Sequence, residues 1–498
     1  MNTEPVTDVT PDELQRLLDA QRAAQAADPV PDAATRRNRI DRFVAAVLEH
    51  ADELAKALDA DFGGRPETTS LELDLLGATD AITFARENLE DWMRPVEVPP
   101  ALGGAVSTTI EIRPKGVVGV IGPWNFPVVL AVLPAVEALA AGNRVMIKIS
   151  DMTPHTGTVF ARAVASRMDA DEVAVVNGGR ATAEAFSELR FDHIFFTGSP
   201  AVGRIVGAAA ARNLVPVTLE LGGKNPAIVA PDADVADAAA RIAPARLVNS
   251  GQVCLCPDYV FVPEQGREAF VEAYRQAVLA HFPTFVDNPD VVAVINEANY
   301  RRVTGLVADA TAKGAAEIVI VPDAERDRLP AAAARRIPPT LLLDVPAGAA
   351  IHREEIFGPV LVVHTYTGID EAIAYAGAGE HPLASYWYGE DGADFRRFLR
   401  DTTSGSVSRN DFALAYMNHA APFGGVGMSG SGGYHGKAGF DTFSHRRPVA
   451  HTNADFAMAP GFVPPLTRER VEGVAATAAA AAATVAARAA GSGGQDRP

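Results

Sequence analysis

Hydrophobic positions follow a helical period at the start of the chain and change to a strand-like pattern near residue 106. Thr10 with Glu13 three positions later forms a capping box, and Pro11 stands at the first helical position. Apolar residues recur at helical spacing over 36–60, and a further helix is expected at about 68–93. The stretch STTIEIRP, which ends at Pro114, alternates with a period of two and therefore predicts a strand.

Short apolar runs then alternate with helical patterns. A first series reads GVVGVIG, NRVMIKI, EVAVVN and FDHIFFTG, and a second, after PVTLELGG, reads PAIVA, YVFVP, EIVIV, TLLLDV and VLVVHTY, with a helix at about 266–280. Such alternation predicts parallel sheets with crossover helices. Two series in 498 residues, more than one core normally serves, predict two α/β units. The Gly-rich stretch 405–450 shows one expected strand, SGSVSRN.

The bulk properties exclude several partners. A formal net charge of −18 gives a surface that repels phosphate backbones, so nucleic acid is not expected. The N-terminal stretch MNTEPVTDVTPDELQ has neither the basic start nor the apolar run of a signal peptide, and we expect a cytoplasmic protein. The Ala-rich tail is expected to form a loose surface helix followed by disorder, too short and too poor in large side chains to span a membrane.

The only two cysteines, Cys254 and Cys256, stand two positions apart in NSGQVCLCPDY. With Asp258 as the sole neighbouring ligand type they fall short of the about four ligands of a zinc site, so no metal is expected. An inert buried pair, a redox pair and one working thiol with a neighbour remain open. If 252–256 is extended, the two Cα atoms lie about 6.6 Å apart on one face, at the outer edge of disulfide reach.

Three further patches place polar groups in apolar or Gly-rich surroundings: GPWNFP (122–127), LELGGKNP (219–226) and EEIFGPV (354–360). Each alone is weak, because Asn125 reads equally as a turn residue and Glu220 as a surface acid. In this order, together with the cysteine stretch, they resemble the aldehyde dehydrogenase superfamily over nearly all of 10–450. The stretches GQVCLCPDYVFV and PFGGVGMSGSGGYHGKAGFDTFSH are similar to its class 3 and coniferyl aldehyde dehydrogenase branch.

The resemblance implies an α/β fold of the aldehyde dehydrogenase type, with a Rossmann-type cofactor domain, an α/β catalytic domain and a small β oligomerisation arm. The cofactor domain would take 1–105 and 117–221, the catalytic domain 222–404, and the arm 106–116 with 405–450. Residues 451–498 would form the Ala-rich, partly disordered tail. Resemblance to class 3 further implies a homodimer.

The implied reaction is NAD(P)-dependent oxidation of an aldehyde to a carboxylic acid. Cys254 matches the nucleophile, which would form a thiohemiacetal and then a thioester. The side-chain amide of Asn125 and the backbone N–H of Cys254 resemble the oxyanion hole. Glu220 matches the general base that activates water, and its presence favours hydrolysis over acyl transfer to coenzyme A. The acylating reaction and a catalytically silent relative are the alternatives.

The cofactor motif differs from the usual dinucleotide fingerprint, because no G-x-G-x-x-G follows the first strand. Instead FFTGSPAVGR resembles the family's phosphate turn, where backbone N–H groups at a helix N-terminus meet a pyrophosphate. The implied cofactor-binding residues are Gly198, Ser199 and Gly203 of this turn, Trp124 for phosphate, Lys148 for the adenosine ribose, and Glu355 and Phe357 for the nicotinamide ribose.

Two departures bear on cofactor and substrate. Where relatives usually read KPSE, this chain reads KISD, with Ile149 for Pro and Asp151 for the ribose-binding Glu. An acidic group there disfavours a 2′-phosphate, so NAD is expected, although the shorter Asp leaves room for NADP. The resemblance implies a medium-chain aliphatic or aromatic aldehyde, and Phe126, Tyr416 and Phe423 are candidate pocket residues.

Overall fold

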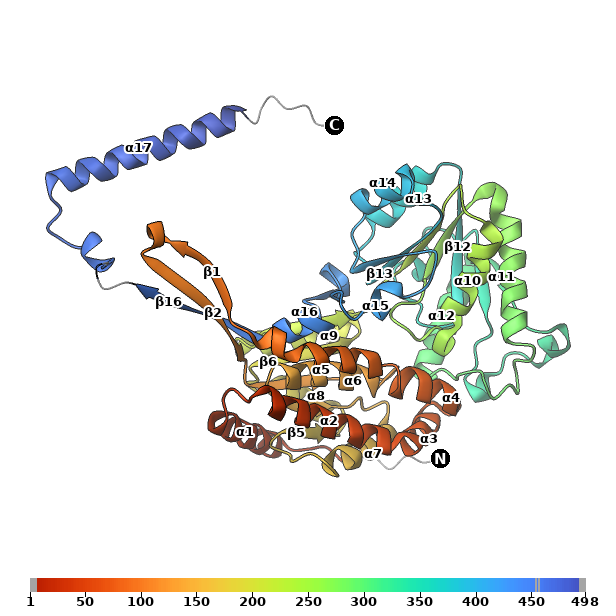
Figure 1. Ribbon diagram of the computed structural model, residues 1–498. Helices are drawn as coiled ribbons and strands as arrows, with labels where there is room; N and C mark the ends of the chain where they lie inside the picture. The colour runs from red at the N-terminus through yellow and green to blue at the C-terminus, as the bar shows by residue number, and fades with distance from the viewer. Residues whose placement is uncertain (1–6, 453–454, 456, 492–498) are drawn as a thin grey trace. The chain divides into compact units, whose positions relative to one another are not determined.

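The computed structural model describes residues 7–452, 455 and 457–491. They form two compact units (Figure 1). Unit 1 contains the residues up to Arg94 together with Ile112–His445, and unit 2 contains Pro95–Glu111 together with the residues from Arg446 onward. All of the predicted site residues belong to unit 1.

Unit 1 begins with helices, as predicted. The Thr10 hydroxyl accepts a hydrogen bond from the Glu13 backbone N–H at 3.3 Å and starts α1 (Pro11–Ala27), which confirms Thr10 as the N-cap. The Glu13 carboxylate accepts from the Thr10 hydroxyl at 3.3 Å rather than from the backbone N–H that a full capping box requires. The predicted helix over 36–60 is divided at His50 into two helices, and a π-helix, Leu71–Leu75, interrupts the region expected as 68–93. The remaining helices of this region are α2 (Ala33–Glu49), α3 (Ala51–Phe62), α4 (Glu67–Ser70) and α5 (Thr79–Met93).

The first sheet of unit 1 has six strands in the order β15-β7-β6-β3-β4-β5. Five are parallel, and the two-residue β15 closes the edge in antiparallel pairing with β7. The strands are β3 (Val117–Ile121), β4 (Arg144–Lys148), β5 (Val173–Val176), β6 (His193–Gly198), β7 (Val217–Leu221) and β15 (Gly430–Ser431), and its helices are α6 (Val129–Ala140), α7 (Pro154–Ala165), α8 (Arg180–Ser187) and α9 (Pro200–Arg212). The first predicted strand series is therefore confirmed.

The second sheet has seven strands in the order β10-β11-β12-β9-β8-β13-β14 and is parallel except for β10. Its strands are β8 (Pro226–Val229), β9 (Tyr259–Pro263), β10 (Ala316–Val319), β11 (Thr340–Leu343), β12 (Val360–Tyr366), β13 (Ala384–Tyr388) and β14 (Ser406–Arg409). Helices α10 (Val235–Leu247), α11 (Arg267–His281), α12 (Glu297–Ala312), α13 (Ile369–Ala378) and α14 (Ala393–Asp401) flank it (Figure 1). Both sheets consist largely of buried strands, as continuous apolar runs predict.

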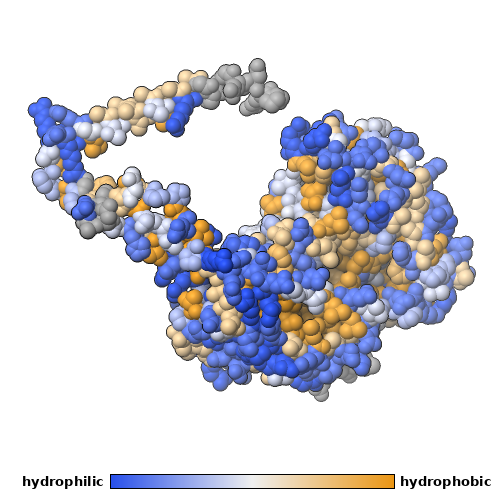
Figure 2. Space-filling view, viewed as in Figure 1, coloured by the Kyte–Doolittle hydropathy of each residue, from blue (hydrophilic) through white to orange (hydrophobic). Residues whose placement is uncertain are grey.

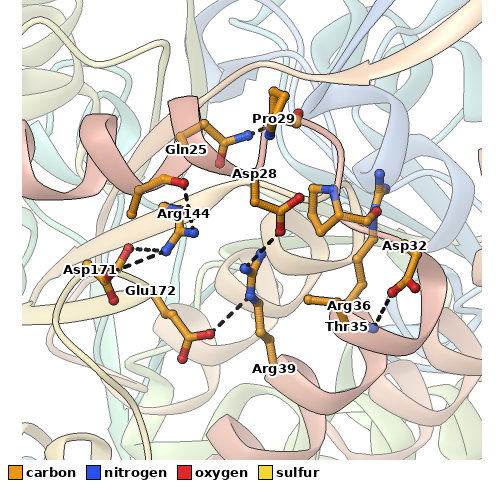
Figure 3. A network of polar contacts seen from close by, with 12 residues as sticks. Gln25, Asp28, Pro29, Asp32, Thr35, Arg36, Arg39, Arg144, Asp171 and Glu172 are labelled. Carbon is orange, nitrogen blue, oxygen red and sulfur yellow. Dashed lines mark hydrogen bonds and ion pairs between the residues drawn. The ribbon is translucent and has the colours of Figure 1, made fainter.

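Charged side chains join the N-terminal helices to the first sheet (Figure 3). The Arg39 guanidinium donates to Glu172 at 3.1 Å and to Asp28 at 3.4 Å. Arg144, at the start of β4, donates to the Asp171 carbonyl oxygen at 2.6 Å. Arg39 and Arg144 are both buried, so these contacts compensate charges that would otherwise lose their solvation.

Unit 2 contains a three-stranded sheet in the order β1-β2-β16. Its strands are β1 (Val96–Ala101), β2 (Val106–Pro114) and β16 (Ser444–Thr452), the last two of which begin or end in unit 1. The structure differs from the arm expected over 405–450. Most of that segment lies in unit 1, where β14 joins the second sheet and β15 joins the first. The helix α15 (Leu414–Met417) lies between these two strands in sequence, and α16 (Gly436–Thr442) follows β15.

The tail of unit 2 forms α17 (Arg468–Gly491), which is longer than the sequence suggested. Arg468–Ala490 is the one helix in the described part of the chain with the length and composition of a membrane span, and its apolar window has no buried residue. Neither property distinguishes a span from a surface helix. The expected disorder concerns 492–498, which lie outside the described residues.

Candidate active site

Unit 1 contains a cleft of about 820 Å³ at the carboxyl ends of the first sheet's strands. Its walls include Ile121 at the end of β3, Lys148 at the end of β4, Gly198 at the end of β6 and Leu221 at the end of β7. Ligands of open parallel sheets bind at this edge. Residues of the second sheet's side, among them Cys254 and Glu355, complete the walls. The surface view shows apolar side chains exposed where the two parts of unit 1 face each other (Figure 2).

The two cysteines occupy different environments. Cys254 is half-buried and lines the cleft, whereas Cys256 is buried and its thiol donates to the Ala245 carbonyl oxygen of α10 at 3.1 Å. The loop is a turn, in which the Cys256 N–H donates to the Val253 carbonyl oxygen at 3.1 Å. The extended conformation considered for 252–256 is therefore wrong, and so is its consequence that both thiols lie on one face. Both cysteines are free.

Buried polar side chains hold this turn in place. The Asn225 amide donates to the carbonyl oxygens of Cys254 at 2.7 Å and Cys256 at 3.0 Å, and its own oxygen accepts the Ala384 N–H at 3.0 Å. The Tyr386 hydroxyl donates to the Leu255 carbonyl oxygen at 2.6 Å. Every carbonyl from 254 to 256 is thus fixed by a side chain that is itself buried.

The residues immediately before the turn have unusual backbone conformations. Asn249, Ser250 and Gly251 have φ of 50°, 52° and 76°. A Cβ at Gly251 would lie 2.2 Å from the Gly358 carbonyl oxygen, so only glycine fits there. The Gln252 amide restrains the segment by donating to the Asn249 oxygen at 3.0 Å and the Ala293 oxygen at 3.1 Å. Local strain of this kind persists only where surrounding contacts over-determine it.

The surroundings of Cys254 favour the neutral thiol. Burial raises its pKa, and the charges of Glu355 and Glu220 raise it further, while its own backbone N–H lowers it. No cationic side chain appears among these influences. A buried thiol of this kind becomes a nucleophile when a backbone dipole or a base favours loss of its proton.

Asn125 is buried and shares the cleft with Cys254. Its side-chain nitrogen donates to the Gln252 carbonyl oxygen at 3.1 Å. Its backbone carbonyl oxygen accepts from Arg65 Nη1 at 2.9 Å and from Asn249 Nδ2 at 3.2 Å. An amide nitrogen carries two hydrogens. One is thus occupied by Gln252, which leaves the other for an oxygen in the cleft.

Glu220 stands on β7, with its carboxyl group buried and on the cleft wall. Neither carboxyl oxygen has a hydrogen-bond partner among the described residues. Burial raises its pKa well above the ordinary value, and the charge of Glu137 raises it further. A buried carboxyl group without a partner is costly unless a ligand or water completes it, and a raised pKa brings its titration toward neutral pH.

The predicted cofactor-binding residues divide into two groups. Most line the same cleft: Trp124, Lys148, Asp151, Gly198, Ser199, Glu355 and Phe357. Gly203 is not among the cleft residues, and its N–H donates to the Ser199 carbonyl oxygen at 2.9 Å. A Cβ at Gly203 would come within 2.7 Å of Leu221 Cδ2. Its contribution is close packing of α9 on β7 rather than contact with a ligand.

Lys148 is buried, and its ammonium group donates to the carbonyl oxygens of Ile149 at 2.6 Å and Gly178 at 2.7 Å. Burial lowers its pKa to about 8, while the charge of Asp151 opposes this shift. An ammonium group has three hydrogens, so one remains for a ligand hydroxyl. Ser199, Ala201 and Val202 at the start of α9 also face the cleft, as a pyrophosphate site requires.

Glu355, Phe357 and Trp124 also line the cleft. Burial raises the Glu355 pKa to about 8. A Cβ at Gly222 would lie 2.1 Å from Glu355 Oε2, so this carboxylate packs directly against the backbone. Phe357 has a φ of 49°. Its ring packs edge-on against the Trp124 ring, with the two ring centres 5.4 Å apart. The residues present therefore fit a dinucleotide, with donors for phosphate and acceptors for ribose.

Aromatic rings gather beside Cys254. Tyr416, Phe423 and Tyr434 line the cleft, and the rings of Tyr416 and Phe423 meet edge-on at 5.1 Å. Two of the three predicted pocket residues are thus found there. The third, Phe126, is not among the cleft residues and instead packs 5.1 Å from the Arg65 guanidinium.

Sequence reasoning missed the residues that hold the site together. Arg65, Asn225 and Gln252 are buried side chains whose contacts cross long stretches of sequence. Asn225 belongs to the motif LELGGKNP and Gln252 to NSGQVCLCPDY, and this position in a motif was the only sequence signal for their role. No motif contains Arg65. Among the described residues no cluster of His, Cys, Asp or Glu could hold a metal ion.

Comparison with known proteins places these residues in a family. The model of the aldehyde dehydrogenase family matches residues 2–449. A probable coniferyl aldehyde dehydrogenase of Caulobacter vibrioides is 46% identical over 455 residues, covering 90% of this chain and 93% of its own. A coniferyl aldehyde dehydrogenase of a Pseudomonas species is 42% identical over 438 residues, covering 88% and 90%. The solved structure of Staphylococcus aureus AldH in a substrate-bound state superposes with a TM-score of 0.84 at 31% identity, covering 93% of this chain and 99% of that one.

The chain belongs to the aldehyde dehydrogenase family. It is an oxidoreductase that oxidises an aldehyde to the carboxylic acid with NAD or NADP, as the family does. The resemblance to the coniferyl aldehyde dehydrogenase branch and the α/β fold are both confirmed.

Proposed function

We propose that oxidation proceeds through a covalent bond between the substrate and Cys254. The observation that carries this proposal is that Cys254, Asn125 and Glu220 line one cleft together with the residues that fit a dinucleotide. The Cys254 thiol gives up its proton to solvent, and its sulfur adds to the aldehyde carbon, so that the carbonyl electrons move onto oxygen as the oxyanion of a thiohemiacetal. As this oxyanion re-forms the carbonyl bond, a hydride leaves the carbon, and NAD would supply the acceptor for that hydride when bound. A thioester on Cys254 remains, and water converts it to the free acid.

Asn125 stabilises the oxyanion formed by the first addition. The hydrogen of its amide that Gln252 does not use and the backbone N–H of Cys254 are the two donors available to that oxygen. The contact to Gln252 fixes the amide before substrate arrives, so little reorganisation is needed at the moment of reaction. Removal of one such donor typically slows an enzyme about 100-fold to 1000-fold.

Glu220 is the general base of thioester hydrolysis. Its unpartnered carboxyl oxygens on the cleft wall are free to accept a proton from water beside the acyl carbon. The raised pKa suits a group that must gain and lose a proton near neutral pH. The presence of Glu220 also supports hydrolysis over acyl transfer to coenzyme A, and the set of three polar groups argues against a silent relative.

NAD is the proposed cofactor, with NADP the weaker alternative. Asp151 lines the cleft close enough to Lys148 for its charge to act on the lysine. A carboxylate there repels a 2′-phosphate and can accept a hydrogen bond from a 2′-hydroxyl. Lys148, with one hydrogen free, can donate to the same ribose.

An aromatic aldehyde is the proposed substrate class. Three aromatic rings line the cleft, and rings of this kind pack well against a flat apolar substrate. The names of the relatives point the same way, since two are coniferyl aldehyde dehydrogenases. We therefore propose coniferyl aldehyde or a similar aryl aldehyde over a medium-chain aliphatic one.

The assembly is proposed to be a homodimer of cytoplasmic protein, formed through the sheet of unit 2. Val96 and Leu102 are exposed apolar residues in that unit. In the described part of the chain β1 and β16 are the outer strands of this sheet, and outer strands can pair with another chain. Sedimentation velocity tests this point, and a monomer at micromolar concentration would contradict it.

A screen of aldehydes followed by NADH absorbance tests the proposed function. We expect kcat/KM to be highest for coniferyl aldehyde, with no turnover for Cys254→Ala. Free acid should form in the absence of coenzyme A, and addition of coenzyme A should leave the rate unchanged. Formation of an acyl-coenzyme A product, or activity in Cys254→Ala, would overturn the mechanism. Higher kcat/KM for aliphatic aldehydes would overturn only the substrate class.

A further inference from the structure

The geometry points to Arg65, held by Asp74, as a positioning residue that fixes the Asn125 amide toward the reacting oxygen. This inference rests on the proposed role of Asn125. Arg65 lies in the loop between α3 and α4, in an N-terminal helical region that contains none of the predicted site residues. It is 1% exposed and reaches the loop after β3 from 60 residues away.

The Arg65 guanidinium contacts two aromatic rings, one carbonyl oxygen and one carboxylate. It stacks 4.9 Å from the centre of the Phe62 ring and 5.1 Å from that of Phe126. Its Nη1 donates to the Asn125 carbonyl oxygen at 2.9 Å, and its Nη2 lies 3.3 Å from Asp74 Oδ2. A planar cation held between two rings is well suited to placing one donor accurately.

Asp74 extends this hold to the start of α6. Its Oδ1 accepts the backbone N–H groups of Val128 at 3.0 Å and Val129 at 2.8 Å, while its other oxygen faces Arg65. The pair therefore grips both ends of the segment 125–129, with the cation at one end and the anion at the other. Both side chains have no exposed surface.

The same Asn125 is also restrained from the side of the nucleophile. The Asn249 side chain donates to the backbone carbonyl oxygen of Asn125 at 3.2 Å. The Asn125 side-chain amide in turn donates to the Gln252 carbonyl oxygen at 3.1 Å. Arg65, which precedes Asn125 in the sequence, adds a third contact to those from Asn249 and Gln252, which follow it. A shift of Asn125 then moves the free amide hydrogen relative to Cys254, and misplacement by about 1 Å can cost about 100-fold in rate.

A buried ion pair that merely stabilises α6 is the simpler explanation, and a double-mutant cycle separates the two. The measured quantity is the rate constant of the NADH burst in wild type, Arg65→Lys, Asn125→Ala and the double variant. Lysine keeps the charge but lacks the planar fork. We expect Arg65→Lys to slow the burst about tenfold in the presence of Asn125 and less than about twofold in its absence, with the KM for NAD unchanged.

Arg36→Lys is the matched control. Arg36 is another arginine that is 1% exposed, and it donates to the carbonyl oxygens of Pro31 at 2.8 Å and Ala140 at 3.0 Å without touching the site. Its burst rate should equal that of wild type. If Arg65→Lys fails to fold, Asp74→Asn, which keeps an oxygen for Val128 and Val129, takes its place in the same cycle.

The outcomes are distinct. Equal slowing by Arg65→Lys with and without Asn125, or the same slowing in Arg36→Lys, would overturn the positioning role and leave the ion pair purely structural. An undiminished burst in Asn125→Ala would instead overturn the proposed role of Asn125 itself. Loss of the effect in the absence of Asn125, with a normal control, supports the inference.

Discussion

Glu137 of α6 and Glu220 of β7 are two buried carboxyl groups, and the charge of Glu137 raises the pKa of Glu220. Burial raises the pKa of Glu137 as well, while the backbone N–H groups of His435 and Gly436 lower it. Like charges in a low dielectric disfavour double ionisation, so an ionised Glu137 makes ionisation of Glu220 less favourable. Glu137 therefore influences the base without touching the substrate.

Glu137→Gln should shift the acid limb of the kcat profile to lower pH. The base works when ionised, and the negative charge of Glu137 disfavours that form, so its removal lowers the Glu220 pKa. The tyrosines that sense Glu137, Tyr416 and Tyr434, stay neutral over this range because burial raises their pKa. Steady-state rates over pH check this, with the exposed Glu53→Gln as control. An unchanged limb would contradict the coupling.

Glu220→Gln should leave a burst of NADH and abolish steady turnover. Attack and hydride transfer precede the step that needs a base, whereas hydrolysis of the thioester does not proceed without one. Stopped-flow absorbance measures the burst, and mass spectrometry should find the acyl group on Cys254. Unchanged steady turnover would remove Glu220 from the mechanism.

Asp151→Ala should narrow the preference for NAD over NADP. The carboxylate repels the 2′-phosphate, so its loss improves NADP more than it harms NAD. The ratio of the two kcat/KM values is the measurement, and its dependence on salt should also weaken in the variant. A wild-type preference for NADP would show that this charge does not decide cofactor choice.

Cys254→Ala should abolish dehydrogenation, whereas Cys256→Ala should retain most of it. Only Cys254 reaches the cleft, and the Cys256 thiol faces the Ala245 carbonyl oxygen. Because the two thiols diverge, Cys256 should not capture a sulfenic acid on Cys254, and wild type and Cys256→Ala should recover equally after peroxide and dithiothreitol. Better recovery of the wild type would show that the turn opens.

Gly251→Ala should abolish activity through the loop rather than through chemistry. The new Cβ would lie 2.2 Å from the Gly358 carbonyl oxygen at a φ of 76°, so the segment before Cys254 must move. Gly305→Ala, on an α12 face with open space, is the control and should be neutral or slightly stabilising. Normal activity in Gly251→Ala would mean that the loop tolerates displacement.

Much of the fold follows from local pattern. Continuous apolar runs predicted the buried parallel strands, and the capping box predicted the start of α1. The strand β1 was missed because Pro99 and Pro100 argue against a strand, although an edge strand tolerates them. The two-residue β15 is too short for any periodicity to reveal.

The site was predictable where a motif carried it and not where tertiary contacts did. Motifs singled out Cys254, Asn125 and Glu220, and all three line one cleft. The spacing of Cys254 and Cys256 could not distinguish an extended segment from a turn. The turn is stabilised by the hydrogen bond from the Cys256 N–H to the Val253 carbonyl oxygen. The contact between Arg65 and Asn125 depends on packing between helices, which no local pattern encodes.

The short β15 has a consequence for biosynthesis. Until residues 430–431 leave the ribosome, β7 is an uncovered edge of the first sheet, although its own residues end at 221. At about 5–20 residues per second that interval lasts roughly 10–40 s. The strand that carries Glu220 is therefore open to pairing with other nascent chains until β15 is synthesised and covers it.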